Sequence, residues 1–215
     1  MTGSTASRIG NVRAICSPSF GRQYVASMLP SFCSTYPGIE IDFDLNDCSP
    51  DPGRTGVDVA IRYGEVSKGD FVARRLCDSA LVVCASPSYL SEHGTPLTID
   101  DLLQHRLILH RSTDSGRPVE WTFDLDDGAV KRRFDGYIVA NDPDLLEQAV
   151  LFGCGPAQLD SEQVSKQVEN GELIPVLTAF APRGGGHFVC YHNGPLTPPR
   201  VKVFVDYLLN HLADY

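Results

Sequence analysis

Two Ser-Pro-Ser turns limit the fold of this chain more than any other feature of its sequence. Ser17-Pro18-Ser19 follows an apolar run at residues 12–16, and Ser86-Pro87-Ser88 follows another at residues 80–85. A helical pattern begins directly after each turn. Serine is a favoured helix N-cap, and proline is tolerated in the first helical turn because its missing N–H has no partner there. Each turn therefore predicts a strand that leads straight into a helix, as in a parallel α/β sheet.

A strand that ends in a hydroxyl group at a helix N-terminus can also hold a ligand. The free N–H groups and the partial positive charge of the helix end favour a carboxylate or a phosphate. Two such turns in separate parts of the chain predict a ligand held between two lobes. The alternative is that each serine only caps its own helix.

The first part of the chain predicts a parallel sheet with crossover connections. Apolar residues recur at i, i+3, i+4 and i+7 in a helix at residues 20–35. Apolar and acidic residues alternate over 39–45, which is the period of a half-exposed strand. A short buried strand follows at 57–61, so the order is strand, helix, strand, loop, strand.

The rest of the chain predicts a second group of strands and helices. The segments 121–123 and 132–134 surround the turn Asp126-Asp127-Gly128, which favours an antiparallel pair. The other predicted elements are strands at 79–85, 107–109, 138–140, 173–177 and 188–191, and helices at 87–92, 98–103, 143–152, 161–169 and 198–212. The number of elements is enough for two lobes of about 100 residues each.

Charge and composition exclude several classes of protein. The 215-residue chain has a formal net charge of −9, so a phosphate backbone would repel it. Residues 1–11 lack the apolar segment of a secretory signal, and no apolar run approaches the roughly 20 residues that cross a bilayer. The seven cysteines are scattered without CxxC spacing, which favours a reducing compartment. We therefore expect a cytoplasmic protein with no membrane partner and no nucleic-acid partner of its own.

The sequence indicates neither a metal site nor a catalytic site. The six histidines form no i, i+4 pair and no HxH motif, and no cysteine motif accompanies them. Gly-x-Ser-x-Gly, P-loop and GxGxxG motifs are absent. Cys154 lies between two glycines, where close helix-to-strand packing explains it better than a nucleophile does. We expect no cofactor, no metal ion and no enzymatic activity.

Several phrases of the sequence together resemble the effector-binding (substrate-binding) domain of LysR-type bacterial transcriptional regulators. The resemblance covers residues 10–212 and rests on the order and spacing of the phrases, since no single phrase is diagnostic. The phrases are Ser17-Pro18-Ser19-Phe20-Gly21-Arg22, Leu29-Pro30-Ser31-Phe32 with Tyr36-Pro37, Asp58-Val59-Ala60-Ile61-Arg62-Tyr63-Gly64, Val72-Ala73-Arg74-Arg75-Leu76, Ala85-Ser86-Pro87-Ser88-Tyr89-Leu90 with His93-Gly94-Thr95-Pro96, Asp101-Leu102 with His105, Trp121, and Gly171-Glu172-Leu173.

The resemblance implies an α/β fold with two Rossmann-like lobes joined by two crossover strands, like a type 2 periplasmic binding protein. Lobe I would hold residues 10–75 and 178–215, and lobe II residues 76–177, after a disordered lead at 1–9. The crossovers would fall near Leu76-Cys77 and near 175–177. Regulators of this family also carry an N-terminal winged helix-turn-helix, for which this chain has no room. The chain thus resembles an excised or truncated effector domain, and DNA contact would belong to the missing part.

The resemblance also implies a small-molecule effector, held between the lobes at the carboxyl ends of the strands. Ser17 and Ser19 match the turn that receives an acidic group, and Ser86 is expected in the equivalent place on the second lobe. Arg62 could pair with a carboxylate or tie the lobes together. Arg111 could equally be a solvated side chain, and Asn141 and Asp142 could be helix caps. The predicted effector-binding residues are Ser17, Ser19, Phe20, Ile61, Arg62, Ser86, His110, Arg111, Asn141 and Asp142.

The family's assembly implies a homodimer, or a tetramer of the intact regulator. The helix at 20–35 and the strand at 39–45 would meet the second lobe of a partner copy. The leading interpretation is therefore a non-enzymatic sensor of a small anionic metabolite. A solute-binding protein of a transporter has the same fold, but the absent signal and the free thiols disfavour it. An enzyme on this scaffold would need a nucleophile–base or paired-acid arrangement that the sequence does not show.

Two segments depart from the family pattern. Residues 51–56 stand where the family has a short helix, so we expect that helix to be frayed or absent. Residues 155–160 replace an apolar strand. In them Pro156 removes a hydrogen-bond donor and Gln158 puts an amide into a normally apolar strand.

Overall fold

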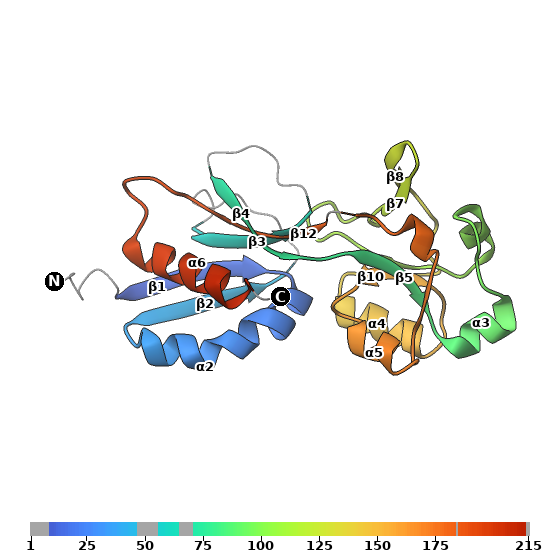
Figure 1. Ribbon diagram of the computed structural model, residues 1–215, viewed down its shortest axis with the longest axis horizontal. Helices are drawn as coiled ribbons and strands as arrows, with labels where there is room; N and C mark the ends of the chain where they lie inside the picture. The colour runs from blue at the N-terminus through green and yellow to red at the C-terminus, as the bar shows by residue number, and fades with distance from the viewer. Residues whose placement is uncertain (1–8, 47–55, 65–70, 184, 214–215) are drawn as a thin grey trace. The chain divides into compact units, whose positions relative to one another are not determined.

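The chain folds as two compact units, each built on its own sheet (Figure 1). The computed structural model describes residues 9–46, 56–64, 71–183 and 185–213. Unit 1 is Met1–Asp78 with Gly186–Tyr215, and unit 2 is Ser79–Gly185. The predicted lead at residues 1–9 and the predicted loss of a helix at 51–56 fall almost entirely outside the described residues.

The unit boundaries fall after residues 78 and 185, whereas the sequence analysis places them after 75 and 177. Residues 178–185 remain with unit 2 for two reasons. The 3₁₀ helix η4 (Thr178–Phe180) contacts the strand β7 (Trp121–Leu125). The Arg183 N–H also donates to the Asp124 carboxylate at 2.9 Å. Both are long-range contacts, which a local sequence pattern does not reveal.

The sheet of unit 1 has the order β2-β1-β3-β12-β4. Its strands are β1 (Gly10–Cys16), β2 (Ile39–Leu45), β3 (Val59–Tyr63), β4 (Val72–Asp78) and β12 (Gly186–Tyr191). The strands β1, β2 and β3 are parallel, and β12 runs antiparallel to both β3 and β4. The predicted parallel crossover is thus present, and β2 is an outermost strand of the sheet.

Helices from the two ends of the chain cover one face of this sheet. The predicted helix at 20–35 is divided into α1 (Pro18–Phe20), a π-helical turn (Gly21–Val25) and α2 (Ala26–Thr35), and the C-terminal helix is α6 (Pro199–His211). Phe32 of α2 meets Phe204 of α6 edge-on, with ring centroids 5.5 Å apart. A Cβ at Gly21 would lie 2.6 Å from the Leu45 side chain, so a larger residue there would require that side chain to move.

The sheet of unit 2 has the order β11-β5-β10-β6-β9. Its strands are β5 (Leu81–Ala85), β6 (Ile108–His110), β9 (Ile138–Ala140), β10 (Ala157–Asp160) and β11 (Ile174–Val176). The strands β6, β9 and β10 are parallel to one another, whereas β5 runs antiparallel to both of its neighbours, β10 and β11. The direction of β5 decides which turns share an edge of this sheet.

The helices of unit 2 are mostly where the pattern predicts them. They are α3 (Pro87–His93), η3 (Asp100–Gln104), α4 (Pro143–Leu151) and α5 (Ser165–Glu169). The segment 98–103, predicted as a helix, forms the 3₁₀ turn η3 instead. Of the helix predicted at 161–169, only the second half is helical, as α5. None of the described helices in either unit has the length and apolar character that a membrane span needs.

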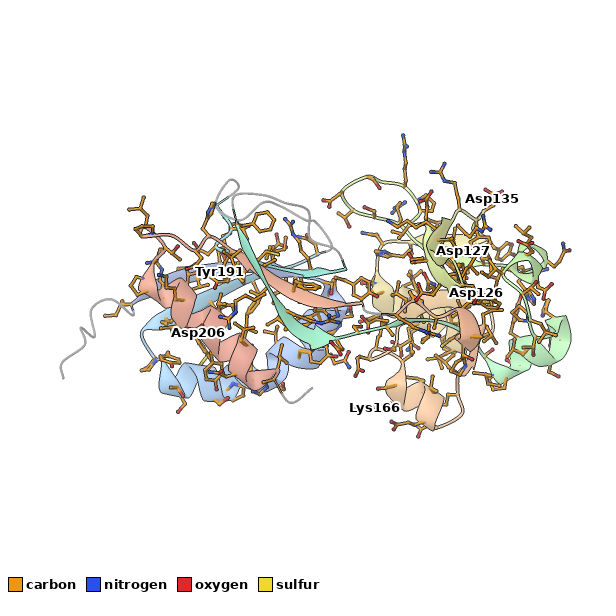
Figure 2. All side chains as sticks on the ribbon, turned by 45° about the horizontal axis from the view of Figure 1, so that its top comes forward. Asp126, Asp127, Asp135, Lys166, Tyr191 and Asp206 are labelled. Atoms are coloured by element: carbon orange, nitrogen blue, oxygen red, sulfur yellow. The ribbon has the colours of Figure 1, made fainter. Side chains whose placement is uncertain are left out.

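Residues 155–160, which depart from the family pattern, still supply the central strand β10 because the side-chain amide of Gln158 has hydrogen-bond partners. Gln158 Nε2 donates to the Thr122 carbonyl at 2.8 Å, and Gln158 Oε1 accepts from the Thr122 N–H at 3.0 Å. Thr122 belongs to β7, which forms a hairpin with β8 (Gly128–Arg132). The turn of this hairpin carries Asp126 and Asp127 (Figure 2). One glutamine side chain therefore fastens the hairpin to the sheet.

We predict that Gln158→Leu destabilises the protein by about 1–3 kcal/mol, because it leaves two backbone groups of Thr122 without partners. Urea unfolding followed by circular dichroism measures the change. Gln148→Leu, at an exposed position of α4, is the matched control. Equal stability of the two variants would contradict a role for Gln158 in holding the hairpin.

Candidate functional site

Ser17, Ser19 and Arg62 lie at the edge of the unit 1 sheet that is formed by the carboxyl ends of β1 and β3. In the description of the sites, an edge of a sheet means such a row of strand ends. The strands β1 and β3 are parallel with Ile15 beside Ala60, so the same register continues to Ser17 beside Arg62. Ser17 Oγ accepts from the Phe20 N–H at 3.3 Å and lies 3.4 Å from Ser19 Oγ. The cap predicted at this turn is present, and both serines are half-buried.

Two other predicted residues of unit 1 have their side chains in the core. Phe20 is 1% exposed, and its ring centroid lies 4.6 Å from that of His187. Ile61 is 6% exposed and belongs to the core beneath α2 and α6. Alternation along β3 directs Arg62 to the opposite face, where its guanidinium lies 5.3 Å from the Phe71 ring centroid. Packing therefore accounts for the Phe20 and Ile61 side chains, and their contact with an effector stays a prediction.

In unit 2, four of the predicted residues meet at one edge of the sheet. His110 ends β6, and Asn141 and Asp142 follow β9, which is parallel to β6. The Arg111 N–H donates to the Ala140 carbonyl at 2.7 Å, which joins the two strand ends. Asp142 Oδ1 accepts from the Leu145 N–H at 2.8 Å and caps α4. The side chains of Arg111 and Asn141 are exposed.

Ser86 lies at the opposite edge of this sheet, so its expected equivalence to Ser17 is corrected. Because β5 is antiparallel to β10, Leu81 stands beside Asp160 while Cys84 stands beside Ala157, where β10 begins. The length of β5, about 16 Å, therefore separates Ser86 from the edge that carries His110. Ser86 is 2% exposed, and its Oγ accepts from the Tyr89 N–H at 3.3 Å as a helix cap.

The same strand direction brings Ser79, Asp160 and Ser161 to the edge that carries His110, and the sequence analysis missed these three residues. Ser79 Oγ donates to Asp160 Oδ2 at 2.8 Å, and Ser161 Oγ accepts from the Ala80 N–H at 3.3 Å. Asp160 Oδ1 also accepts from the Glu162 N–H at 3.0 Å. Only knowledge that β5 runs antiparallel to β10 would have identified these residues, and the sequence pattern does not specify strand direction.

The described cysteines and histidines form no reactive or metal-binding arrangement. Among the residues that the structure describes, no three His, Cys, Asp or Glu side chains are placed to hold a metal ion. Burial raises the pKa of the Cys84 thiol to about 12, and burial also raises the pKa of the Cys190 thiol to about 11. A thiol with such a pKa is protonated at neutral pH and is a poor nucleophile.

Comparison with known families and proteins gives consistent matches. The sequence model of the family described as LysR substrate binding domain matches residues 6–213. The HTH-type transcriptional regulator DmlR of Escherichia coli (strain K12) is 29% identical over 206 residues, 96% of this chain and 66% of that protein. An HTH-type transcriptional regulator of Xanthomonas campestris pv. campestris (strain 8004) is 32% identical over 202 residues, 92% of this chain and 59% of that protein. The chain thus spans less than two thirds of the length of these relatives.

Solved structures show the same fold. CrgA, a LysR-type transcriptional regulator from Neisseria meningitidis, aligns with a TM-score of 0.81 and 26% identity over 96% of this chain and 69% of that chain. The regulatory domain of CrgA aligns with a TM-score of 0.79 and 27% identity over 95% of this chain and 99% of that chain. These matches confirm the predicted fold class. The relatives are named as transcriptional regulators, which confirms the prediction of a non-enzymatic domain.

We predict that an alkylating reagent at about pH 8 labels Cys33 quickly and leaves Cys84 and Cys190 unlabelled, because Cys33 is exposed whereas burial shields the other two thiols and raises their pKa values. Peptide mass spectrometry after short labelling times measures the three rates. Labelling in concentrated urea, where all seven cysteines should react, is the control. Equal rates at Cys33 and Cys84 in the folded protein would show that the thiol of Cys84 is not shielded.

Proposed function

The chain belongs to the family of LysR substrate binding domains, and on this premise we propose that it is the ligand-sensing and dimerisation domain of a cytoplasmic transcriptional regulator. The effector is a small anionic metabolite. DNA binding belongs to an N-terminal domain outside this chain, and the intact regulator is a homodimer or a tetramer. The chain's length relative to the regulators DmlR and that of Xanthomonas campestris supports this division of roles.

The observation that carries the proposal is the set of polar groups at one edge of each sheet. Unit 1 offers the hydroxyl groups of Ser17 and Ser19 beside Arg62. Unit 2 offers His110 and the exposed Arg111 at the ends of parallel strands. Hydroxyl groups and guanidinium groups are suitable donors to a carboxylate or a phosphate. In our proposal these groups are the donors that bind the effector.

Regulation then follows from unequal affinity for two arrangements of the units. A ligand that binds one arrangement more tightly than the other shifts the population toward that arrangement. The free-energy difference between arrangements is what the DNA-binding domains of the intact protein would sense. A solute-binding protein of a transporter would use the same edges, and regulation of DNA binding in the intact protein distinguishes the two functions.

We predict that one member of a panel of organic acids, amino acids, aromatic carboxylates and phosphorylated metabolites raises the melting temperature. At about 100 times its Kd a ligand adds roughly 2.7 kcal/mol, on the order of 5–10 °C for a chain of this size. Ser17→Ala should abolish most of this shift because it removes a donor at the proposed edge. Differential scanning fluorimetry gives the comparison.

Ser86→Ala is the matched control for this experiment. Both substitutions remove a helix N-cap, and each should lower stability by about 0.5–2 kcal/mol. Ser86 lies at the other edge of its sheet, so Ser86→Ala should keep the ligand-induced shift. A shift that survives Ser17→Ala, or is lost only in Ser86→Ala, would refute the proposed site.

Two surfaces support the proposed dimer. In unit 1, β2 is an edge strand with one unpaired side, and α2 lies next to it along the chain. In unit 2, Leu145 and Phe152 are 55% and 82% exposed and stand seven residues apart on α4 and its C-cap, on one face of the helix. We propose that the surface of α2 and β2 meets this face of α4 in a partner copy, where the contact would remove the exposed Leu145 and Phe152 side chains from water.

We predict that Phe152→Asp weakens dimerisation by about 2 kcal/mol, roughly thirtyfold in Kd, because it places a charge in an apolar contact. Sedimentation equilibrium measures the change. Leu103→Asp, at a leucine that is 67% exposed outside the proposed surface, is the control. The assignment of this surface fails if Phe152→Asp and the control dimerise equally well.

A further inference from the structure

A second concave site lies in unit 1, at the edge of the sheet opposite to Ser17 and Arg62. Asp58 directly precedes β3, and His192 directly follows the antiparallel strand β12. Tyr191 pairs with Val59, so the register continues to His192 beside Asp58. The pocket at this edge has a volume of about 450 Å³, and its lining residues include Val57, Asp58, His192, Leu196, Pro198 and Val201. This volume lies in the range of small-molecule sites.

The walls of this pocket are fixed by hydrogen bonds. Thr197 Oγ1 donates to the His192 carbonyl at 2.8 Å and accepts from the Gly194 N–H at 2.8 Å, which closes the loop between β12 and α6. Arg200 Nε donates to the Asn11 carbonyl at 2.8 Å and holds the start of α6 against β1. Figure 1 shows this connection, which leads from β12 back to the start of α6. The pocket therefore needs little ordering before a ligand binds.

The wall of the pocket is mainly apolar, and its rim exposes a large side chain. Val57, Pro198 and Val201 line the interior, and Leu196 at the rim is 95% exposed. A ligand that covered Leu196 would remove this apolar surface from water. The body of a fitting ligand is thus apolar.

Asp58 is the one carboxylate among the described lining residues, and it determines the charge that the pocket accepts. Asp58 Oδ2 accepts from the backbone N–H of Arg13 at 2.9 Å. The guanidinium group of Arg13 instead contacts Asp42, with Nε and Oδ2 3.5 Å apart. The Asp58 carboxylate is therefore not neutralised by that guanidinium, and it disfavours an anionic ligand.

We propose that this pocket is a second ligand site, which takes a small apolar amine with its ammonium group toward Asp58 and its apolar body against Val57, Leu196 and Val201. The inference goes beyond the sensing function above. It concerns the opposite edge of the sheet and a ligand of the opposite charge.

The test is a titration of the ¹⁵N-labelled protein with benzylamine, benzyl alcohol and benzoate, which share one ring and differ in charge. The titration is carried out at about pH 8. Two-dimensional NMR then follows the backbone amides of Asp58, Gly194 and Val201. We expect saturable shifts at these amides with benzylamine, weaker binding of benzyl alcohol, and no saturable binding of benzoate.

Two variants test the assigned contacts. Asp58→Asn keeps an acceptor for the Arg13 N–H but removes the charge, so the Kd for benzylamine should rise by up to about fivefold. Leu196→Ser changes an exposed side chain and should also weaken benzylamine binding without affecting the fold. Leu103→Ser, at a leucine of unit 2 that is 67% exposed, is the matched control and should leave the Kd unchanged.

The proposal is overturned if benzoate binds as tightly as benzylamine, if no probe gives saturable shifts at the pocket, or if neither pocket variant changes the Kd. Should Asp58→Asn fail to fold, the Leu196→Ser variant and the order of the three probes still decide between these outcomes.

Discussion

The direction of β5 is the constraint on which the arrangement of unit 2 depends. This strand carries the chain into the unit and runs antiparallel to both of its neighbours. Its start therefore lies beside the ends of the parallel strands, and Ser79 reaches the Asp160 carboxylate there. Its end lies at the far edge, where Ser86 caps α3. One reversed strand thus decides which polar groups can act together on one ligand.

The return strand β12 has the same effect in unit 1. Because β12 is antiparallel to β3, its start lies beside Tyr63 and its end lies beside Val59. The edge that holds Ser17 carries hydroxyl and guanidinium groups, whereas the other edge carries the Asp58 carboxylate and an apolar wall. The two edges of one sheet therefore differ in the charge that they would accept.

Polar groups inside the units follow the rule that a buried donor or acceptor needs a partner. Gln158 meets both backbone groups of Thr122, which turns an apparent defect of a central strand into the attachment of a hairpin. Glu147 of α4 is 8% exposed, and the side-chain amides of Gln163 and Gln167 donate to its carboxylate at 3.0 and 2.6 Å. These pairs join segments that are separated in the sequence. A buried polar residue considered without its partner would therefore be judged destabilising.

The amino-acid sequence by itself determined the local elements and the family. The caps at Ser17, Ser86 and Asp142, the helical periods and the alternation of Ile39–Leu45 are local patterns, and the structure has an element at each. These patterns depend only on neighbouring residues, which is why they could be read without coordinates.

Only the tertiary structure decided which of these elements share an edge. Ser17 and Ser86 occupy the same strand–turn–helix motif, yet only Ser17 lies at a strand end that parallel neighbours share. The core positions of Phe20 and Ile61, the partner of Gln158 and the pocket beside Asp58 likewise depend on strand order and register. Those quantities are set by contacts between segments far apart in the chain, and the local pattern of a segment carries no record of them.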